Sequence, residues 1–190
     1  MDLHKSLLAA ALLLSPALAF AHPGHDHSGL LSGFAHPLFG LDHLLAMLAV
    51  GLWAAQQQGE ARWVLPLTFV ITMLFGGLFG FTGIDLPLME TSIAGSVLAL
   101  GLLVALAVRP ALPVAMGLTA LFALSHGVAH GLELPELTSP WSYAAGFVAT
   151  TAALHGTGYA VARNLPRAAA PLVRLAGLAS ALSGAWLLAA

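Results

Sequence analysis

The sequence predicts an all-α integral membrane protein, in which a bundle of six transmembrane helices follows a cleavable N-terminal signal peptide. Composition gives the first reason, since 59% of the 190 residues are hydrophobic and 7% are charged, against about 25% charged residues in a soluble domain. The mean hydropathy of +0.91 agrees with this class. Six apolar stretches give the second reason, because a helix needs about 20 mostly apolar residues to cross a bilayer.

The first 21 residues have the pattern of a secretory signal. Lys5 supplies a short basic region, residues 7–14 are apolar, and Ala19-Phe20-Ala21 fits a small-x-small cleavage site. An uncleaved first transmembrane helix is the alternative, but the apolar run is short for a span and is interrupted by Pro16. We therefore predict that residues 1–21 form a signal peptide.

Two further segments follow the signal: a short His-rich N-terminus over residues 22–30, and a membrane domain over residues 31–190. The expected spans of this domain cover residues 31–55, 63–84, 86–108, 112–131, 141–162 and 168–190. The connections between them are short and rich in Gly, Pro, Asn and Asp, which favour turns. They leave no room for a second, soluble domain.

The charged residues orient these spans. All five arginines fall in the first, third and fifth loops: Arg62, Arg109, Arg163, Arg167 and Arg174. The second and fourth loops contain four acidic residues and no Lys or Arg: Asp85, Glu90, Glu133 and Glu136. Because cytoplasmic loops of membrane proteins carry an excess of Lys and Arg, we predict that both mature termini lie outside.

Several function classes are excluded by what the chain lacks. It contains no cysteine, which excludes disulfides, thiolate metal sites and thiol catalysis. No phosphate-binding loop is present, so the chain does not hydrolyse ATP itself. The net charge of −2 gives no indication of a nucleic-acid partner, and the expected partners are the lipid bilayer and a small ion.

Histidine and carboxylate side chains stand inside the predicted spans, where polar groups are costly and usually mark a pathway. In the first span, His36 and His43 are seven residues apart and share a face of a continuous helix. Asp42 lies beside His43 and is expected to pair with an imidazole on another helix, because neighbours on one helix do not pair easily. In that role it would fix the tautomer of a ligating histidine.

The fourth span carries a second group of such residues. His126 and His130 are four residues apart, a spacing at which two histidines can chelate one ion. Gly127 and Gly131 follow them and leave space beside the imidazoles, and Glu133 stands just past the helix end. Imidazole and carboxylate together suit Ni²⁺, Zn²⁺, Co²⁺ or Fe²⁺ better than Cu(I).

Helical rise sorts the candidate ligands into two tiers of depth. The outer tier, within roughly 10 Å of the outer boundary, holds His36, His126, His130, Glu133 and Glu90. The middle tier, roughly 15 to 20 Å deep, holds Asp42, His43 and His155. The predicted mature N-terminus adds His22, His25 and His27 as a metal-collecting tract. These positions predict a path for a divalent metal ion that enters from outside.

The two motifs resemble those of the HupE/UreJ family of nickel and cobalt permeases. The family pattern H-P-x₄-D-H matches His36, Pro37, Asp42 and His43, and H-G-x-A-H-G-x-E matches the segment from His126 to Glu133. The resemblance covers the whole chain. It implies uptake of Ni²⁺ or Co²⁺ through the inner membrane of a bacterium, to supply hydrogenase, urease or cobalamin enzymes, with no permanently bound cofactor and no enzymatic activity.

Two other functions remain open from the residues alone. Three histidines and an aspartate could hold Zn²⁺ with an open position for an activated water, as in an intramembrane hydrolase. A scaffold for metalloenzyme assembly is the third alternative. The hydrolase predicts one tightly held metal ion, whereas the transporter predicts weak and exchangeable binding, because an ion held too tightly cannot leave.

Overall fold

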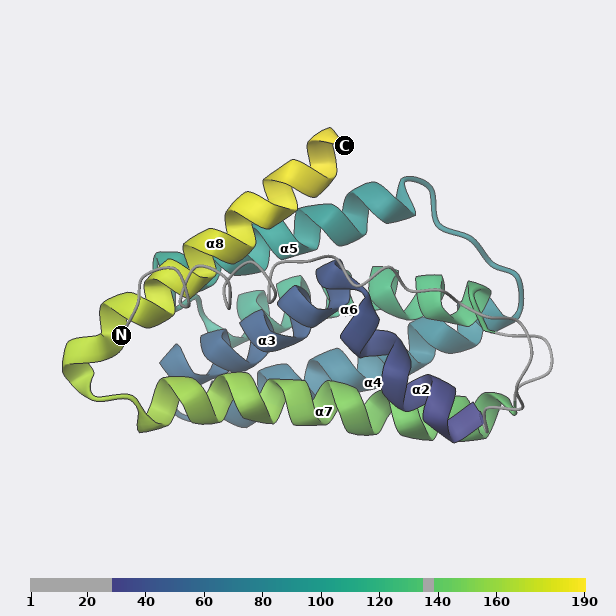
Figure 1. Ribbon diagram of the computed structural model, residues 1–190, viewed down its shortest axis with the longest axis horizontal. Coiled ribbons are helices and arrows are strands. Elements are labelled where there is room, and N and C mark those ends of the chain that lie inside the picture. Colours follow the sequence, from purple (N-terminus) through teal and green to yellow (C-terminus); the bar gives the residue numbers. More distant parts are fainter. Residues whose placement is uncertain (1–28, 135–138) are drawn as a thin grey trace, which may run out of the picture.

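The computed structural model describes residues 29–134 and 139–190, which form an all-helical bundle (Figure 1). In chain order its elements are α2 (Gly29–Phe39), α3 (Leu41–Gln56), α4 (Ala61–Phe81), α5 (Met89–Ala105), α6 (Leu112–Leu132), α7 (Pro140–Asn164), the 3₁₀ turn η1 (Arg167–Ala169) and α8 (Ala170–Ala189). The predicted signal peptide, His22, His25, His27 and Glu136 lie outside the described residues.

The first predicted span is two helices, so the expectation of one continuous helix over residues 31–55 is wrong. Helices α2 and α3 meet at a bend of 82°, which is visible where the purple ribbon turns in Figure 1. Pro37 lies inside α2 and has no N–H to donate to the carbonyl of Gly33. Gly40 then adopts extended backbone, with φ −84° and ψ 117°, and becomes the N-cap of α3.

The other five predicted stretches are helices whose ends lie within a few residues of the expected ones. Three of the described helices, α4, α6 and α8, are long and apolar enough to cross a membrane, and the bent pair α2 and α3 forms a fourth candidate. Helix α5 has 17 residues, and α7 has 25 residues but includes polar positions such as Thr151 and His155. That α5 and α7 also cross the membrane stays a prediction.

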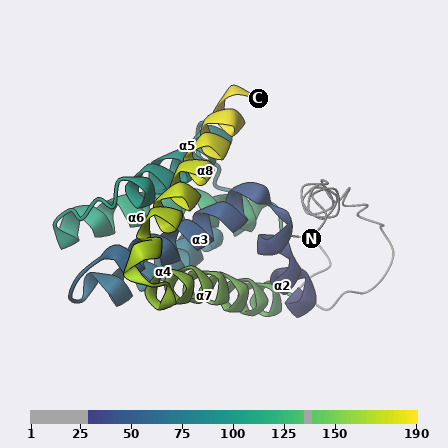
Figure 2. The same cartoon turned by 60° about the vertical axis from the view of Figure 1, so that its left-hand side comes forward.

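The bundle is built from close helix pairs. Helix α4 packs on α6, α5 on α8, and both α2 and α3 on α7; the pair α5 and α8 is seen side by side in Figures 1 and 2. Glycines make the first pair close, because a Cβ added at Gly80 would stand 2.1 Å from the carbonyl oxygen of Val128. Small residues at helix contacts let membrane helices approach in this way.

The glycine contact gives a stability prediction. We expect Gly80→Ala to lower the thermal unfolding temperature of the detergent-purified protein, because the added methyl group forces α4 and α6 apart and overpacking costs about 1–3 kcal/mol. Gly117→Ala is the matched control, since nothing lies within 4 Å of its added Cβ. Circular dichroism on heating measures both, and equal unfolding temperatures would contradict the packing argument.

Three side-chain contacts connect the helix ends next to the α3–α4, α5–α6 and α7–α8 loops. The indole Nε1 of Trp53 donates to the carbonyl of Val108 at 2.9 Å, and Nε of Arg174 donates to the carbonyl of Ala105 at 2.7 Å. The rings of Trp63 and Tyr159 lie 5.2 Å apart. The connections α3–α4, α5–α6 and α7–α8 therefore lie at the same end of the bundle. The arginines stand in or next to these connections: Arg62, Arg163 and Arg174 lie near the ends of α4, α7 and α8 and not in the loops themselves.

Candidate metal site

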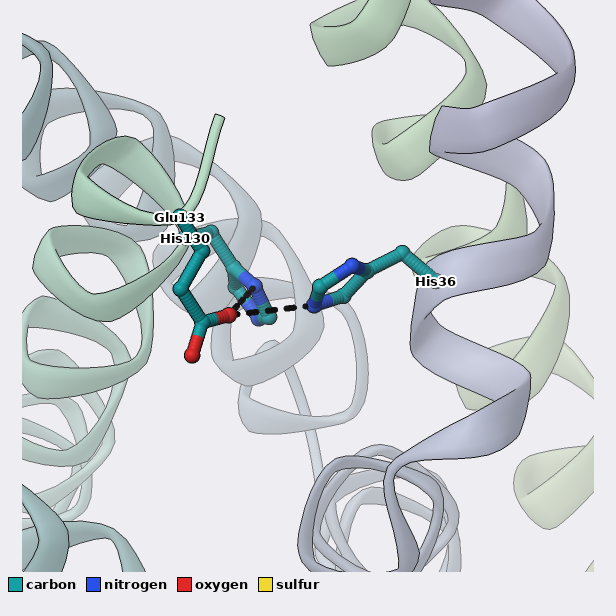
Figure 3. Close-up of side chains that lie close together, drawn as sticks. All are labelled: His36, His130 and Glu133. Carbon is teal, nitrogen blue, oxygen red and sulfur yellow. Dashed lines mark ion pairs between the residues drawn. The ribbon is translucent and has the colours of Figure 1, made fainter. Parts of the chain in front are cut away.

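A group of three potential metal ligands joins α2 to the end of α6. Nε2 of His36 lies 3.3 Å from Oε2 of Glu133, and Nδ1 of His130 lies 3.8 Å from the same oxygen. One ligand atom from each residue falls within 4.8 Å of the others. Figure 3 shows His36 reaching across from its helix toward Glu133 and His130. Since Zn²⁺-like ions hold nitrogen and oxygen at about 2.0–2.2 Å, small side-chain rotations would place all three on one ion.

The bend between α2 and α3 extends this group into the bundle. His36 stands near the end of α2 and His43 in the first turn of α3, with ring centroids 6.3 Å apart. The His43 ring lies 4.1 Å from that of His130 and 4.8 Å from that of His126. Four imidazoles are thus neighbours, brought together by the bend and not by a shared face of one helix.

Asp42 pairs with the adjacent His43, which corrects the expectation that its partner lies on another helix. Both the backbone N–H and the Nδ1–H of His43 donate to Oδ1 of Asp42, at 2.8 and 2.9 Å. This geometry is available because Asp42 lies in the first turn of α3, where its carboxylate can fold back onto the following residue. The proton on Nδ1 leaves Nε2 of His43 as the atom with a free lone pair.

His126 is oriented in the same way by its own helix. Its Nδ1–H donates to the carbonyl oxygen of Phe122 at 2.8 Å, which again leaves Nε2 as the lone-pair nitrogen. Among the described residues, neither Nε2 of His43 nor Nε2 of His126 has a hydrogen-bond partner, and both atoms are buried. Buried polar atoms are normally paired, so this donor set fits a metal ion.

Exposure decreases from the mouth of the site to its interior. A polar pocket of about 460 Å³ opens beside His36, Asp42, His43 and Glu133. The Glu133 side chain is 53% exposed and that of His36 35%, whereas His130 is almost fully buried. The neighbouring His36 imidazole lowers the pKa of the Glu133 carboxyl, and Asp42 places negative charge near the positive N-terminal end of α3. The negative charges of Glu133 and Asp42 favour a cation at the mouth.

The predicted separation into two tiers is not seen. His43, expected in the middle tier, contacts His126 and His130, which were expected in the outer one. His155 is buried, and Phe69 is the ring that it shares with the cluster: the centroid of Phe69 lies 5.7 Å from that of His126 and 5.2 Å from that of His155. An aromatic residue in an apolar helix gives no sequence signal, so Phe69 could not be singled out.

Glu90 is exposed in the first turn of α5 and lies outside the group of His36, His130 and Glu133, so its role as a ligand stays a prediction. One further expectation differs from the structure. Gly127 and Gly131 do not leave space beside the histidines. A Cβ at Gly127 would stand 2.1 Å from the carbonyl oxygen of Met73, so these glycines serve the contact with α4.

Comparison with known proteins identifies the family of the chain. The family model described as HupE / UreJ protein matches residues 10–187. Protein HupE of Rhizobium leguminosarum bv. viciae is 46% identical over 189 residues, which is 99% of each chain. No solved structure matches. These matches show that the chain belongs to the HupE/UreJ family.

Proposed function

We propose that this protein carries Ni²⁺, or Co²⁺, into a bacterial cell across the inner membrane, as a facilitator or a secondary transporter. The observation that carries the proposal is the continuous line of ligands from exposed Glu133, through His36, His130 and His43, to buried His126. Family membership supports a role in the uptake or handling of nickel or cobalt. The incoming metal ion would supply hydrogenase, urease or another metalloenzyme.

The proposed topology has six spans, with α2 and α3 together as the first and with both mature termini in the periplasm. The gathering at one end of the loops with arginines in or next to them supports it, because such loops favour the cytoplasmic side. His36 and Glu133 then stand at the periplasmic mouth. The bent first span resembles the broken helices of other transporters, whose irregular backbone lines a cavity.

In this proposal the ion moves by exchange between neighbouring ligand sets. Glu133 and His36 capture it at the mouth, and Nε2 of His43 and of His126, both held in a ligating tautomer, receive it inside. His130 contacts both the ligands at the mouth and those inside, since its ring lies 4.8 Å from that of His36 and 4.1 Å from that of His43. His155 would take the ion beyond Phe69. Overlapping sets of few ligands favour release as well as binding.

Radioactive nickel accumulation tests this function in cells that lack their own nickel uptake. Cells that express the chain should accumulate nickel from micromolar medium, and cells with the empty vector should not. Excess unlabelled cobalt should reduce the signal, since the same nitrogen and oxygen ligands suit both ions. Accumulation equal to the vector control, with the protein present in the membrane fraction, would contradict the proposal.

The N-terminal histidines are proposed to collect metal ion for the mouth of the site. Deleting residues 22–27, which include His22, His25 and His27, should raise the nickel concentration needed for half-maximal uptake. Uptake at high nickel should remain intact, because the ligands of the bundle are untouched. Replacing the three histidines with serine keeps the length of the segment, so this control separates loss of the histidines from shortening of the chain. Loss of uptake at every nickel concentration would show that the segment does more than collect metal ions.

An intramembrane zinc-dependent hydrolase is the second candidate. The contacts of His43 with both His126 and His130 favour it, because three imidazoles can hold Zn²⁺ and leave one position open. Metal analysis separates the two candidates. One zinc ion per chain that survives purification and prolonged chelation would favour the hydrolase, and a chain that loses its metal ion readily would favour the transporter.

A further inference from the structure

A second cavity, distinct from the polar mouth, is lined in part by His130. It has a volume of about 490 Å³ and is formed by α4, α6 and α7. Its walls are apolar and include Leu74, Phe75 and Leu78 of α4 and Trp141 and Ala144 of α7. The volume falls within the range of about 300–1,000 Å³ that is typical of ligand sites. We call this cavity the α4–α7 groove.

Residue size argues against another helix as the occupant of the α4–α7 groove. Membrane helices associate through small residues that let their backbones approach. Gly76 and Gly80 of α4 are already used, since they face the backbone of α6, which leaves Gly77 as the small residue of α4 at the groove. The other residues that α4 presents to the groove are large, and several are exposed, such as Phe75 at 59% and Leu78 at 50%. A flexible chain fits such walls better than a rigid helix.

The position of the groove argues for a lipid tail. Helices α4 and α6 are two of the three that are long and apolar enough to cross a membrane, so their outer surfaces face hydrocarbon. Trp141, 77% exposed at the start of α7, stands at one end of the groove. Tryptophan is enriched where a membrane meets water, which places a lipid headgroup beside it and the acyl chain along the groove.

We propose that one acyl chain of a membrane phospholipid occupies the α4–α7 groove and forms the lateral wall of the histidine cluster at His130. His130 lines the groove and also belongs to the group with His36 and Glu133. The tail keeps water from the groove side of this imidazole, so its polar contacts are confined to the other histidines and Glu133. The lipid site needs no assumption about the transported ion.

Photolabelling of the full-length purified protein in lipid nanodiscs tests the proposal. The probe is a phosphatidylethanolamine with a photoactivatable group midway along one acyl chain, and labelled peptides are identified by mass spectrometry. We expect Ala144→Phe to reduce labelling of α4 and α7 groove residues about tenfold, because the added ring fills the space of the tail. Labelling of the exposed α8 face, around Leu182, should not change.

Leu182→Phe is the matched control, since it adds the same ring to an exposed position outside the groove and should leave groove labelling intact. Leu74→Trp provides a second blocking variant if Ala144→Phe does not fold. Groove labelling that is unaffected by either blocking variant would overturn the proposal.

A photo-crosslinking phenylalanine analogue at position 75 identifies the occupant directly, and an adduct of phospholipid mass supports the lipid site. An adduct with a second copy of the chain, or with residues 1–21, would overturn it. Nickel uptake is measured separately, so failure of the lipid site and failure of the proposed transport are distinguishable.

Discussion

Replacing Asp42 or His43 with alanine is expected to abolish nickel uptake while the protein remains in the membrane. His43 contacts both histidines of α6 and offers a buried Nε2 with no partner among the described residues, so its loss interrupts the line of ligands. Asp42 fixes the His43 tautomer through a 2.9 Å bond and adds negative charge at the mouth. Loss of such a supporting carboxylate typically costs about 10- to 100-fold in metal affinity or activity.

The control for this pair is Ser32→Ala, because Ser32 lines the same polar pocket without offering an imidazole or carboxylate. Its uptake should equal that of the unmodified protein. Initial rates of radioactive nickel uptake, normalised to the amount of protein in the membrane, make the comparison. Unchanged rates in both Asp42→Ala and His43→Ala would exclude His43 from the path.

The second large effect is expected at His130. Its ring lies among those of His36, His43 and Phe147, and its Nδ1 is 3.8 Å from Glu133. His130 thus contacts His36 at the mouth and His43 further inside. We expect His130→Ala to reduce nickel uptake by roughly 100-fold, because loss of a ligand should cost at least as much as loss of a residue that only orients a ligand. The variant should also weaken nickel binding by the purified protein.

Thr119→Val on the same helix is the matched control for His130→Ala. Thr119 is also fully buried, but its hydroxyl donates to the carbonyl of Ala115 one turn earlier and takes no part in the site. The variant should keep full uptake. Isothermal titration calorimetry also measures the affinity of the purified protein for nickel. A packing defect alone would leave this affinity unchanged. Normal nickel binding and uptake in His130→Ala would remove His130 from the proposed path.

The sequence predicts the helical class and the positions of the helices well, because apolar length and turn residues dominate both. It fails at Gly40, since a proline and a glycine near the start of a long apolar stretch are compatible with a continuous helix and with a break. That failure has further consequences. Without the bend, His36 and His43 are expected two turns apart on one face, and Asp42 cannot be recognised as a first-turn residue.

The ligand types were predictable from the two motifs, whereas their mutual contacts depend on how α2, α3 and α6 pack. Spacings of seven and four residues predict which histidines share a face of one helix. They do not predict that His43 contacts both histidines of α6. The sequence predicts a role for Gly127 and Gly131 beside the histidines, because each glycine directly follows one of them. Their role in the contact with α4 follows from the tertiary fold.

Ion uptake by purified protein in liposomes tests the central claim most directly. Ni²⁺, Co²⁺, Zn²⁺ and Mn²⁺ would be compared with and without a proton gradient, for the unmodified chain and for His130→Ala. The account predicts entry of Ni²⁺ or Co²⁺ above that of protein-free liposomes, little entry of Mn²⁺, and loss of entry in the variant. Equal metal entry into liposomes with and without the protein would contradict it.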